Sequence, residues 1–374
     1  MKIVNTLHQH IQKPGESVEA YARRKRIELG RDIQFTPKVY LDTKFWVFLR
    51  DARMGRPSSD HVVKLVQLLE ALVSKRLVVC PISLDTFVEI FHQTDPKTLS
   101  VTAQLVDDLS MGVAMLTLDE RIRLEVFHFV REKTIGAGSV YSPNELVWTK
   151  MAYVWGFMMP SCDVFPADLD TVMQKAFVDQ MWSITLADML DQLGPKAVSS
   201  IPRFNDIAPK LNQGKFAHLD DCSSFKQLFF SELAGILEEY KPVFKDLMTY
   251  IYEADTGQRP TADELSADDS GRMLANLIYH AFRQNKINTE LPSFHVYAGL
   301  HAAVRWDTKR KYKPNDLHDF HHAVAAVPYC DYFLTENSLR HLARDKNLDL
   351  SALFRCQTFS YASDAVATLS QLGT

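Results

Sequence analysis

The run Lys38-Val39-Tyr40-Leu41-Asp42-Thr43 is a short apolar segment that ends in a carboxylate. Its β-branched and aromatic side chains predict a buried strand. Residues 60–73 follow with apolar side chains at helical spacing and with Asp60 as the expected N-cap. A second strand is expected at 77–80 and a second helix at 82–91. The order strand, helix, strand, helix favours a parallel sheet flanked by helices.

The C-terminal part has the same α/β character. Asn315 is expected to cap a helix over residues 316–327, which Pro328 ends. A strand at 331–335, a helix at 337–344 and a last strand at 353–359 follow. A further strand is expected at 113–116.

Between these ends, residues 121–304 repeat apolar side chains at helical spacing and contain no comparable series of strands. Thr261 and Glu264 have the form of a capping box. Two independent α/β domains would leave each end with too few strands. We therefore predict a helical arm at 1–35, an α/β core at 36–120 and 305–374, and an all-helical insertion at 121–304.

The composition excludes several classes of protein. A formal net charge of −4 excludes a generally basic protein that coats nucleic acid. It does not exclude a nucleic-acid enzyme that has a local basic patch beside an acidic centre. Five scattered cysteines without a C-x-x-C pair argue against a disulfide framework and a zinc ribbon. The N-terminus lacks the apolar core of a signal peptide, and the apolar stretch 147–160 is too short to span a bilayer. A cytoplasmic protein without a membrane partner is predicted.

Three acids occupy positions that sheet packing does not explain. Asp42 closes the first strand, Glu89 lies beside an apolar helical face, and Asp319 lies in the first turn of the helix at 316–327. Taken singly, Asp42 suits an N-cap and Glu89 a surface position. Taken together they favour a shared site, because the carboxyl ends of parallel strands converge on one crevice.

The order and spacing of these motifs resemble the PIN-domain nucleases, including toxin ribonucleases of VapC type. The family opens with a strand ending in Asp, as at Asp42, and continues with S-x-x-T-x-x-E, matched by Ser83, Thr86 and Glu89. Its third acid, matched by Asp319, begins an Ala-rich helix that leads to a strand ending like Thr335-Glu336-Asn337. The resemblance covers residues 36–95 and 310–360, and a long helical insertion is absent from the small toxins.

The resemblance implies a three-layer α/β/α core and a metal-dependent endoribonuclease that acts on RNA rather than DNA and leaves 5′-phosphate and 3′-hydroxyl ends. Asp42, Glu89 and Asp319 become the catalytic, metal-holding acids. Asn337 falls at the position of the fourth acid, where it supplies no carboxylate, so Asp331 or Glu336 is considered in its place. Thr43 and Thr335 are expected to contact the substrate. A toxin–antitoxin setting would follow from analogy alone.

The chemistry of clustered carboxylates supports a cation at such a site. Three carboxylates held close together repel one another and resist ionisation without a counter-charge. Oxygen ligands suit Mg²⁺ or Mn²⁺ better than zinc. A bound cation lowers the pKa of a water molecule and neutralises charge on the phosphate. The predicted cofactor is therefore Mg²⁺ or Mn²⁺.

A basic segment precedes the Asp319 helix. It contains Trp306 and Tyr312 among its cations, which are Arg305, Lys309, Arg310, Lys311 and Lys313. Positive charge with interleaved aromatic rings suits a phosphate backbone and unstacked bases. A solvated basic loop is an equally good interpretation. The insertion is expected to shape the substrate cleft, or to bind a protein partner or a second copy of the chain.

Three other interpretations remain open. His318, Asp319, His321 and His322 suggest an HD-type metal phosphohydrolase on an all-helical fold. The hexapeptide from Arg123 to His128 has the R-x-x-x-x-H form of HEPN ribonucleases. A PIN-like scaffold without catalysis, binding RNA or a protein partner, is the non-enzymatic alternative.

Overall fold

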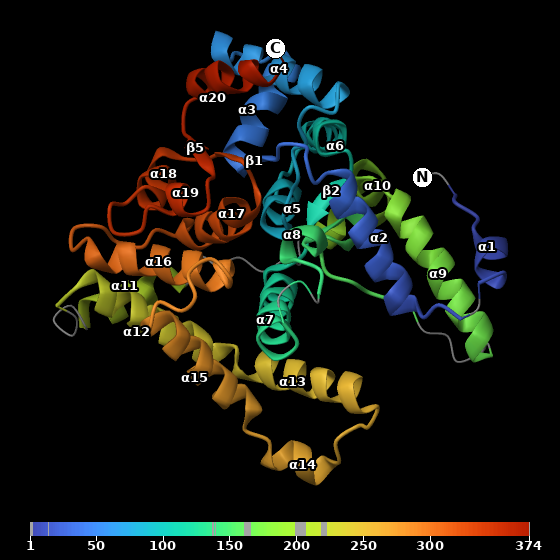
Figure 1. Ribbon diagram of the computed structural model, residues 1–374. Coiled ribbons are helices and arrows are strands. Elements are labelled where there is room, and N and C mark those ends of the chain that lie inside the picture. Colours follow the sequence, from blue (N-terminus) through green and yellow to red (C-terminus); the bar gives the residue numbers. More distant parts are fainter. Residues whose placement is uncertain are drawn as a thin grey trace.

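A computed structural model gives the fold and describes residues 3–13, 15–136, 138, 140–160, 166–198, 207–217 and 223–373. The described chain is mostly helical and contains two small sheets (Figure 1).

The first part of the chain contains α1 (Leu7–Ile11), α2 (Val18–Asp32), β1 (Val39–Leu41), α3 (Thr43–Arg53), α4 (Asp60–Ser74), α5 (Leu84–Phe91), α6 (Pro96–Ser110) and β2 (Val113–Met115). The middle contains α7 (Leu118–Thr134), α8 (Pro143–Leu146), β3 (Trp148–Lys150), η1 (Met151–Tyr153), α9 (Ala167–Ser183), α10 (Leu186–Val198), α11 (Ile207–Ala217), α12 (Phe225–Glu239), α13 (Lys241–Thr256), α14 (Ala262–Ala267), α15 (Ser270–Arg283) and α16 (Pro292–Trp306). The last part contains α17 (Asp316–Tyr329), β4 (Tyr332–Leu334), α18 (Asn337–Ala343), α19 (Leu350–Leu353), β5 (Gln357–Phe359), α20 (Ala362–Leu369) and η2 (Ser370–Gly373).

The central sheet is parallel, with the strand order β1-β4-β5. It confirms that the two ends of the sequence build one mixed α/β unit. The segment at 77–80 is extended but forms no full strand. Val79 makes a single parallel bridge to Lys38, and Ile82 makes one to Ala114 in β2. This segment therefore joins the central sheet to the second, smaller sheet.

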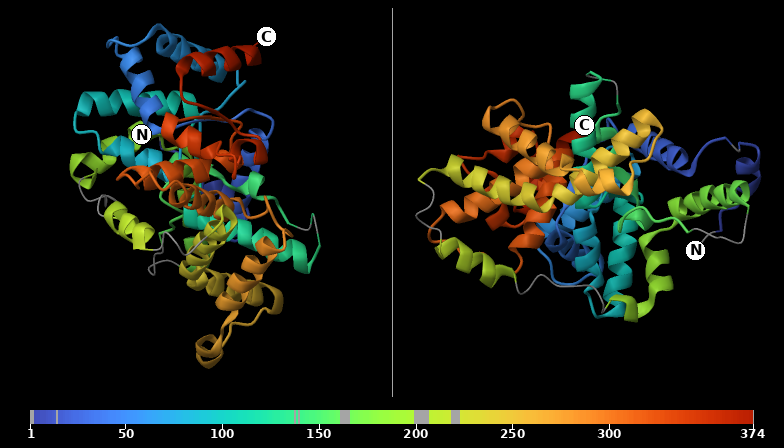
Figure 2. Two further views of the ribbon diagram at one scale, coloured as in Figure 1. Left: turned by 90° about the vertical axis from the view of Figure 1, so that its left-hand side faces the viewer. Right: turned by 90° about the horizontal axis from the view of Figure 1, so that it is seen from below.

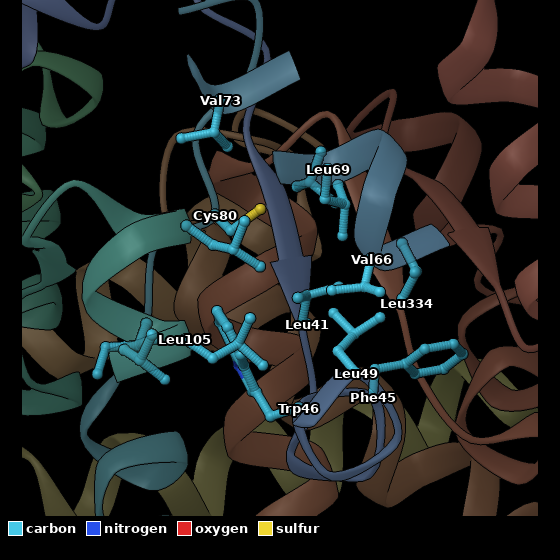
Figure 3. Close-up of a cluster of buried hydrophobic side chains, with 14 of the residues drawn as sticks. Leu41, Phe45, Trp46, Leu49, Val66, Leu69, Val73, Cys80, Leu105 and Leu334 are labelled. Carbon is cyan, nitrogen blue, oxygen red and sulfur yellow. The ribbon is translucent and has the colours of Figure 1, made fainter. Parts of the chain in front are cut away.

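Helices cover both faces of the central sheet, because successive strand side chains point to opposite sides. Leu41 and Leu334 pack with Phe45, Trp46 and other residues of α3, α4 and α6 on one face (Figure 3). Tyr40 and Phe333 pack against α16 and α17 on the other face. Full burial of a side chain of this size contributes about 2 kcal/mol, so these two clusters fix both helical layers on the sheet.

Helix α17 lies close against the sheet because its buried face consists largely of small residues. Ala323, Ala325 and Ala326 are fully buried. The helix continues through Pro328 to Tyr329, two residues beyond the predicted end, and the Cys330 amide still bonds the Ala326 carbonyl. The predicted side-chain cap at Asn315 is wrong, since its side chain makes no capping bond.

The segment 121–304 is not entirely helical. β3 pairs antiparallel with β2, which confirms the strand expected at 113–116 and adds one that was not predicted. Three residues are too few to show an alternating pattern, so the periodicity of the sequence gives no sign of β3. The helices α12, α13, α15 and α16 share a separate apolar cluster with α7. Helices α13, α14 and α15 project from the body at the end away from α3 and α4 (Figure 1 and Figure 2).

Several element ends also differ from expectation. Ser59 rather than Asp60 caps α4, accepting a bond from the Val62 amide. The last strand begins only at Gln357, because α19 occupies residues 350–353. The capping box at Thr261 and Glu264 is confirmed.

Cys80, Cys330 and Cys356 are buried free thiols, whereas Cys162 and Cys222 lie outside the described residues. Among the helices that the structure describes, none is long and apolar enough to cross a membrane.

The N-terminal arm is helical, as predicted, and one carboxylate holds it to α9. Asp179 accepts bonds from the Tyr21 hydroxyl at 2.6 Å, the Lys25 ammonium at 2.6 Å, the Thr6 hydroxyl at 2.7 Å and His10 Nε2 at 2.8 Å. Burial would raise the pKa of Asp179, but the bonds from Lys25 and Tyr21 outweigh it and lower this pKa to about 2. Lys25, from the basic run at 23–26, is therefore a structural cation.

Replacing Asp179 with Ala should release α1 and α2 from α9. The change leaves the buried donors of Tyr21 and His10 without their acceptor, and we expect a loss of about 3 kcal/mol in the free energy of unfolding. Urea denaturation measures the loss, and trypsin should then cleave at Arg23–Arg26 in the folded protein. Asp168→Ala, an exposed position on the same helix, is the control. Equal resistance of both variants to urea and trypsin would contradict this role.

Candidate functional site

Asp42 and Glu336 lie together at the carboxyl edge of the central sheet. One oxygen of Asp42 accepts from the Phe45 amide at 3.2 Å, so this carboxylate is the N-cap of α3. Its other oxygen accepts from the Glu336 amide, just beyond β4, at 3.0 Å. Asp42 is 4% exposed, and the buried Thr335 precedes Glu336. The N-cap interpretation and the site interpretation of Asp42 are therefore compatible.

Two carboxylates of α5 meet two adjacent histidines of α17. His322 Nε2 lies 3.0 Å from a Glu89 oxygen, and His321 Nδ1 lies 3.0 Å from an Asp85 oxygen. Glu89 also accepts a bond from the Thr43 hydroxyl at the start of α3. Glu89 is thereby held between α3 and α17, with its side chain 23% exposed.

His322 is the buried centre of this arrangement. Its Nδ1 lies 2.8 Å from the Tyr40 hydroxyl, which also contacts the hydroxyls of Ser83 at 2.7 Å and Thr86 at 3.1 Å. The Ser83 side chain makes no capping bond to α5. The Ser and Thr of the S-x-x-T-x-x-E pattern thus orient Tyr40, which in turn orients His322 toward Glu89.

Asp319 completes the cluster from the first turn of α17. Burial raises the pKa of Asp319 to about 7; the charge of His322 opposes this shift, and Asp42 and Glu336 add to it. Burial likewise raises the pKa of Asp42 to about 6, with His322 and Thr335 opposing and Glu89 adding. The charge of Glu89 therefore acts on Asp42, and the charge of Asp42 acts on Asp319. Asp42, Glu89 and Asp319, which are far apart in sequence, gather around His322.

The histidine supplies the positive charge in this arrangement. Burial alone would lower the pKa of His322, but Tyr40, Glu89 and Asp85 around it raise it well above the usual value. Burial would raise the pKa of Glu89, and the charge and hydrogen bond of His322 lower it instead. Burial acts in the same direction on Asp85, where the charge of His321 outweighs it and lowers the pKa to about 2.

The donors present suit a hard cation, although their arrangement is not that of a formed metal site. Within the described parts of the chain, no three His, Cys, Asp or Glu side chains are placed to hold a metal ion. The described residues supply no hydrogen-bond donor to the Asp319 carboxylate, and two acids of the cluster have raised pKa values. Buried carboxylates with raised pKa values are stabilised in their ionised form by Mg²⁺ or Mn²⁺.

Of two further residues predicted for the metal site, Asp331 lies elsewhere and Asn337 bonds a residue outside the acid cluster. Asp331 precedes β4, at the opposite edge of the sheet from Asp42, and accepts a bond from the Lys38 amide at 2.7 Å. Asn337 is exposed and accepts from the Ser360 hydroxyl at 3.2 Å. Glu336 is therefore the fourth acid near the cluster. Thr43 and Thr335 lie at the site as expected.

Sequence reasoning gave no role at this site to Tyr40, Asp85, His321 and His322. The group His318, His321 and His322 suggested a different enzyme class, and Tyr40 was interpreted only as a strand residue. The sequence did contain one signal for Tyr40. Its hydroxyl lies on a strand whose other residues are apolar, and a buried hydroxyl needs a hydrogen-bond partner.

The basic segment before α17 is partly structural. Arg305 pairs with Glu232, and Arg310 pairs with Asp316 at 3.0 Å. These two arginines, which were predicted to bind substrate, therefore have structural partners instead. Lys309, Lys311 and Lys313 are exposed. The ammonium of Lys215 donates to the carbonyls of Val304 at 2.7 Å and Asp307 at 2.6 Å, which fixes the shape of the loop.

The two other enzyme classes fit the structure less well. A parallel sheet next to α17 contradicts the all-helical core of an HD-type phosphohydrolase. Arg123 faces Asp246 at 3.4 Å on the surface, and His128 faces Glu132 on its own helix at 3.4 Å. Both residues of the HEPN-like hexapeptide therefore have local structural partners.

No family model matches the chain, and no curated protein or solved structure matches it. The functional argument therefore depends on the geometry of the site.

Proposed function

We propose that the chain is a metal-dependent nuclease, and specifically an endoribonuclease, built on a PIN-like core. One observation carries the proposal: Asp42, Glu89 and Asp319 come from three separate segments and converge at the carboxyl edge of a parallel sheet. This edge is the usual ligand site of such sheets. The preference for RNA and the comparison with the PIN-domain nucleases come from the resemblance of the sequence motifs.

In this proposal Asp42, Glu89 and Asp319 hold Mg²⁺ or Mn²⁺, and Glu336 lies beside them. A bound cation of this kind stabilises negative charge on the phosphate and lowers the pKa of water. The chain keeps its acids in place through short local contacts. The Phe45 and Glu336 amides fix Asp42, while Thr43 and His322 fix Glu89. Asp85 holds His321 in the same way beside the cluster.

The same proposal predicts how Mn²⁺ and pH affect thermal stability. The pKa values of Asp42 and Asp319 are raised to about 6 and about 7, above the value of about 3.9 for an unfolded Asp. Both acids therefore favour the folded state less as pH rises from about 4 to about 7. A cation that binds only the folded chain should offset this loss, by about 2.7 kcal/mol at a hundred times its dissociation constant.

Differential scanning fluorimetry measures this linkage. We expect the melting temperature in EDTA to fall between pH 5 and pH 8, and Mn²⁺ to raise it more at pH 8 than at pH 5. Ca²⁺ and Zn²⁺ are useful comparison ions. A melting temperature that Mn²⁺ leaves unchanged at pH 8 counts against the proposed metal site.

The second candidate is a scaffold that binds RNA or a protein partner without cleaving. It is favoured by His322, whose charge compensates the acids without a cation. Cleavage assays distinguish the two: a scaffold neither cuts RNA in Mn²⁺ nor gains thermal stability from it.

A further inference from the structure

A pocket of about 480 Å³ lies between the start of α12 and the end of α15, outside the acid cluster. Its walls carry two aromatic rings and two cations, and no acid is among the described residues that line it. The Lys226 ammonium lies 5.9 Å from the Phe230 ring, and the Arg283 guanidinium lies 5.9 Å from the Tyr279 ring. The Phe230 and Tyr279 rings pack edge to face, with their centroids 5.8 Å apart and an interplanar angle of 73°. This combination suits a ligand with both a flat ring and a negative charge.

The pocket connects to the basic segment through aromatic contacts. Ser224 lines the pocket, and the next residue, Phe225, has its ring 6.3 Å from Trp306. Trp306 is 42% exposed and begins the loop that carries Lys309, Lys311 and Lys313. The Lys311 ammonium lies 5.7 Å from the Phe216 ring of α11. The loop then enters α17, whose first turn carries Asp319.

The cations and aromatic rings of the pocket and of the loop form one surface, which we call the basic track: Lys226, Phe230, Tyr279, Arg283, Trp306, Lys309, Lys311 and Lys313. Within the described chain, no carboxylate lies at ion-pair distance from the five cations of the track. In contrast, Arg24, Arg53 and Arg131 each pair with an acid. Positive charge is thus left unneutralised in one region of a chain whose formal net charge is −4.

The loop of the track is held in place before any ligand arrives. Lys215 binds the loop carbonyls of Asp307 and Arg310, and Asn212 bonds both the amide and the carbonyl of Tyr312, at 2.8 and 2.9 Å. A prearranged surface loses less conformational entropy on binding. The exposed lysines of the loop are therefore displayed from a fixed backbone.

We propose that the basic track binds single-stranded nucleic acid, with a base stacked against the Phe230–Tyr279 pair and phosphates along the cations toward α17. Base stacking on aromatic rings together with cations that follow the backbone is the usual mode of single-strand binding. Duplex ends offer no unstacked base to the pocket. This inference extends the proposed nuclease function by naming where its substrate is held.

Binding of fluorescein-labelled oligouridylate in EDTA, followed by fluorescence anisotropy, tests the track without cleavage. For Lys226→Glu/Arg283→Glu we expect about tenfold weaker binding and a salt dependence reduced by about 1.4 log units per log unit of salt. The matched control is Lys64→Glu/Lys75→Glu, on α4 and directly after its last residue, which makes the same change of charge at exposed positions at the other end of the molecule (Figure 1). Control binding should stay within about twofold of wild type.

A second variant separates stacking from charge. Tyr279→Leu should weaken oligouridylate binding by about fivefold and leave binding of inorganic polyphosphate unchanged. Wild-type affinity in Lys226→Glu/Arg283→Glu, or an equal loss in the α4 control, overturns the track. Binding through the track without Mn²⁺-dependent cleavage would support the track and contradict the proposed nuclease function. Mn²⁺-dependent cleavage together with unaltered binding in the variants would support the nuclease function and contradict the track.

Discussion

Asp319→Asn is expected to lower the rate of RNA cleavage by about a hundredfold or more while leaving the protein folded. A cation that stabilises the reacting phosphate contributes several kcal/mol, and each 1.36 kcal/mol corresponds to about a factor of ten in rate. The described residues donate no hydrogen bond to Asp319, so an amide of the same shape breaks no contact there. The measurement is cleavage of a fluorescent RNA in Mn²⁺.

The same variant should be as stable as the wild type, or more stable, at pH 8 in EDTA. The raised pKa of Asp319 means that its ionised form is unfavourable in the folded chain, and Asn removes that charge. Asp42→Asn is a poorer test, because the amide nitrogen of Asn cannot accept the bond that Asp42 receives from Glu336. Asp263→Asn, in the first turn of α14, is the matched control. Normal cleavage by Asp319→Asn would contradict the assignment of Asp319 as a metal-holding acid.

The sequence predicted the parts of the fold that depend on long or sharply bounded patterns. β1, β4 and β5 follow from apolar runs with clear ends, and α4, α5 and α17 from helical spacing. β3 is too short to leave a periodic signal, because tertiary contacts rather than local propensity hold it. The apolar run at 77–80 predicted a strand, whereas the structure forms only single bridges at Val79 and Ile82.

For the site, position within a strand or helix was more informative than residue type. Asp42, Glu89 and Asp319 were identified because each stands at an element end or beside an apolar face. Asp331 was misplaced because it precedes β4: the residue before a parallel strand lies at the edge opposite to the residue after it. The pairing of His322 with Glu89 joins residues on different helices, and no spacing within one helix encodes it.

His322→Ala should be the most destabilising single change at the site. His322 is 1% exposed, bonds Tyr40 and Glu89, and carries the charge that offsets three neighbouring acids. Removing one partner of a buried ion pair costs about 3–5 kcal/mol. We expect a loss of this size in the free energy of unfolding at pH 8 in EDTA, measured by urea denaturation.

The stability lost with a buried charge depends on pH and on bound cations, whereas the stability lost when a simple cavity is created does not. Without His322 the carboxyl groups of Asp42 and Asp319 lose the charge that lowers their pKa values, so both bind protons more readily in the folded state. Through these two acids, the variant should therefore become more stable as pH falls from 8 to 5. The wild type additionally gains stability over this range, because the pKa of His322 is raised well above its usual value. Mn²⁺ should restore part of the loss at pH 8.

Phe320→Ala is the control, because Phe320 is fully buried on the same helix and carries no titratable group. Phe320→Ala should lose stability equally at both pH values and in Mn²⁺. If His322→Ala behaves in the same way, the three acids do not form one electrostatic unit around this histidine.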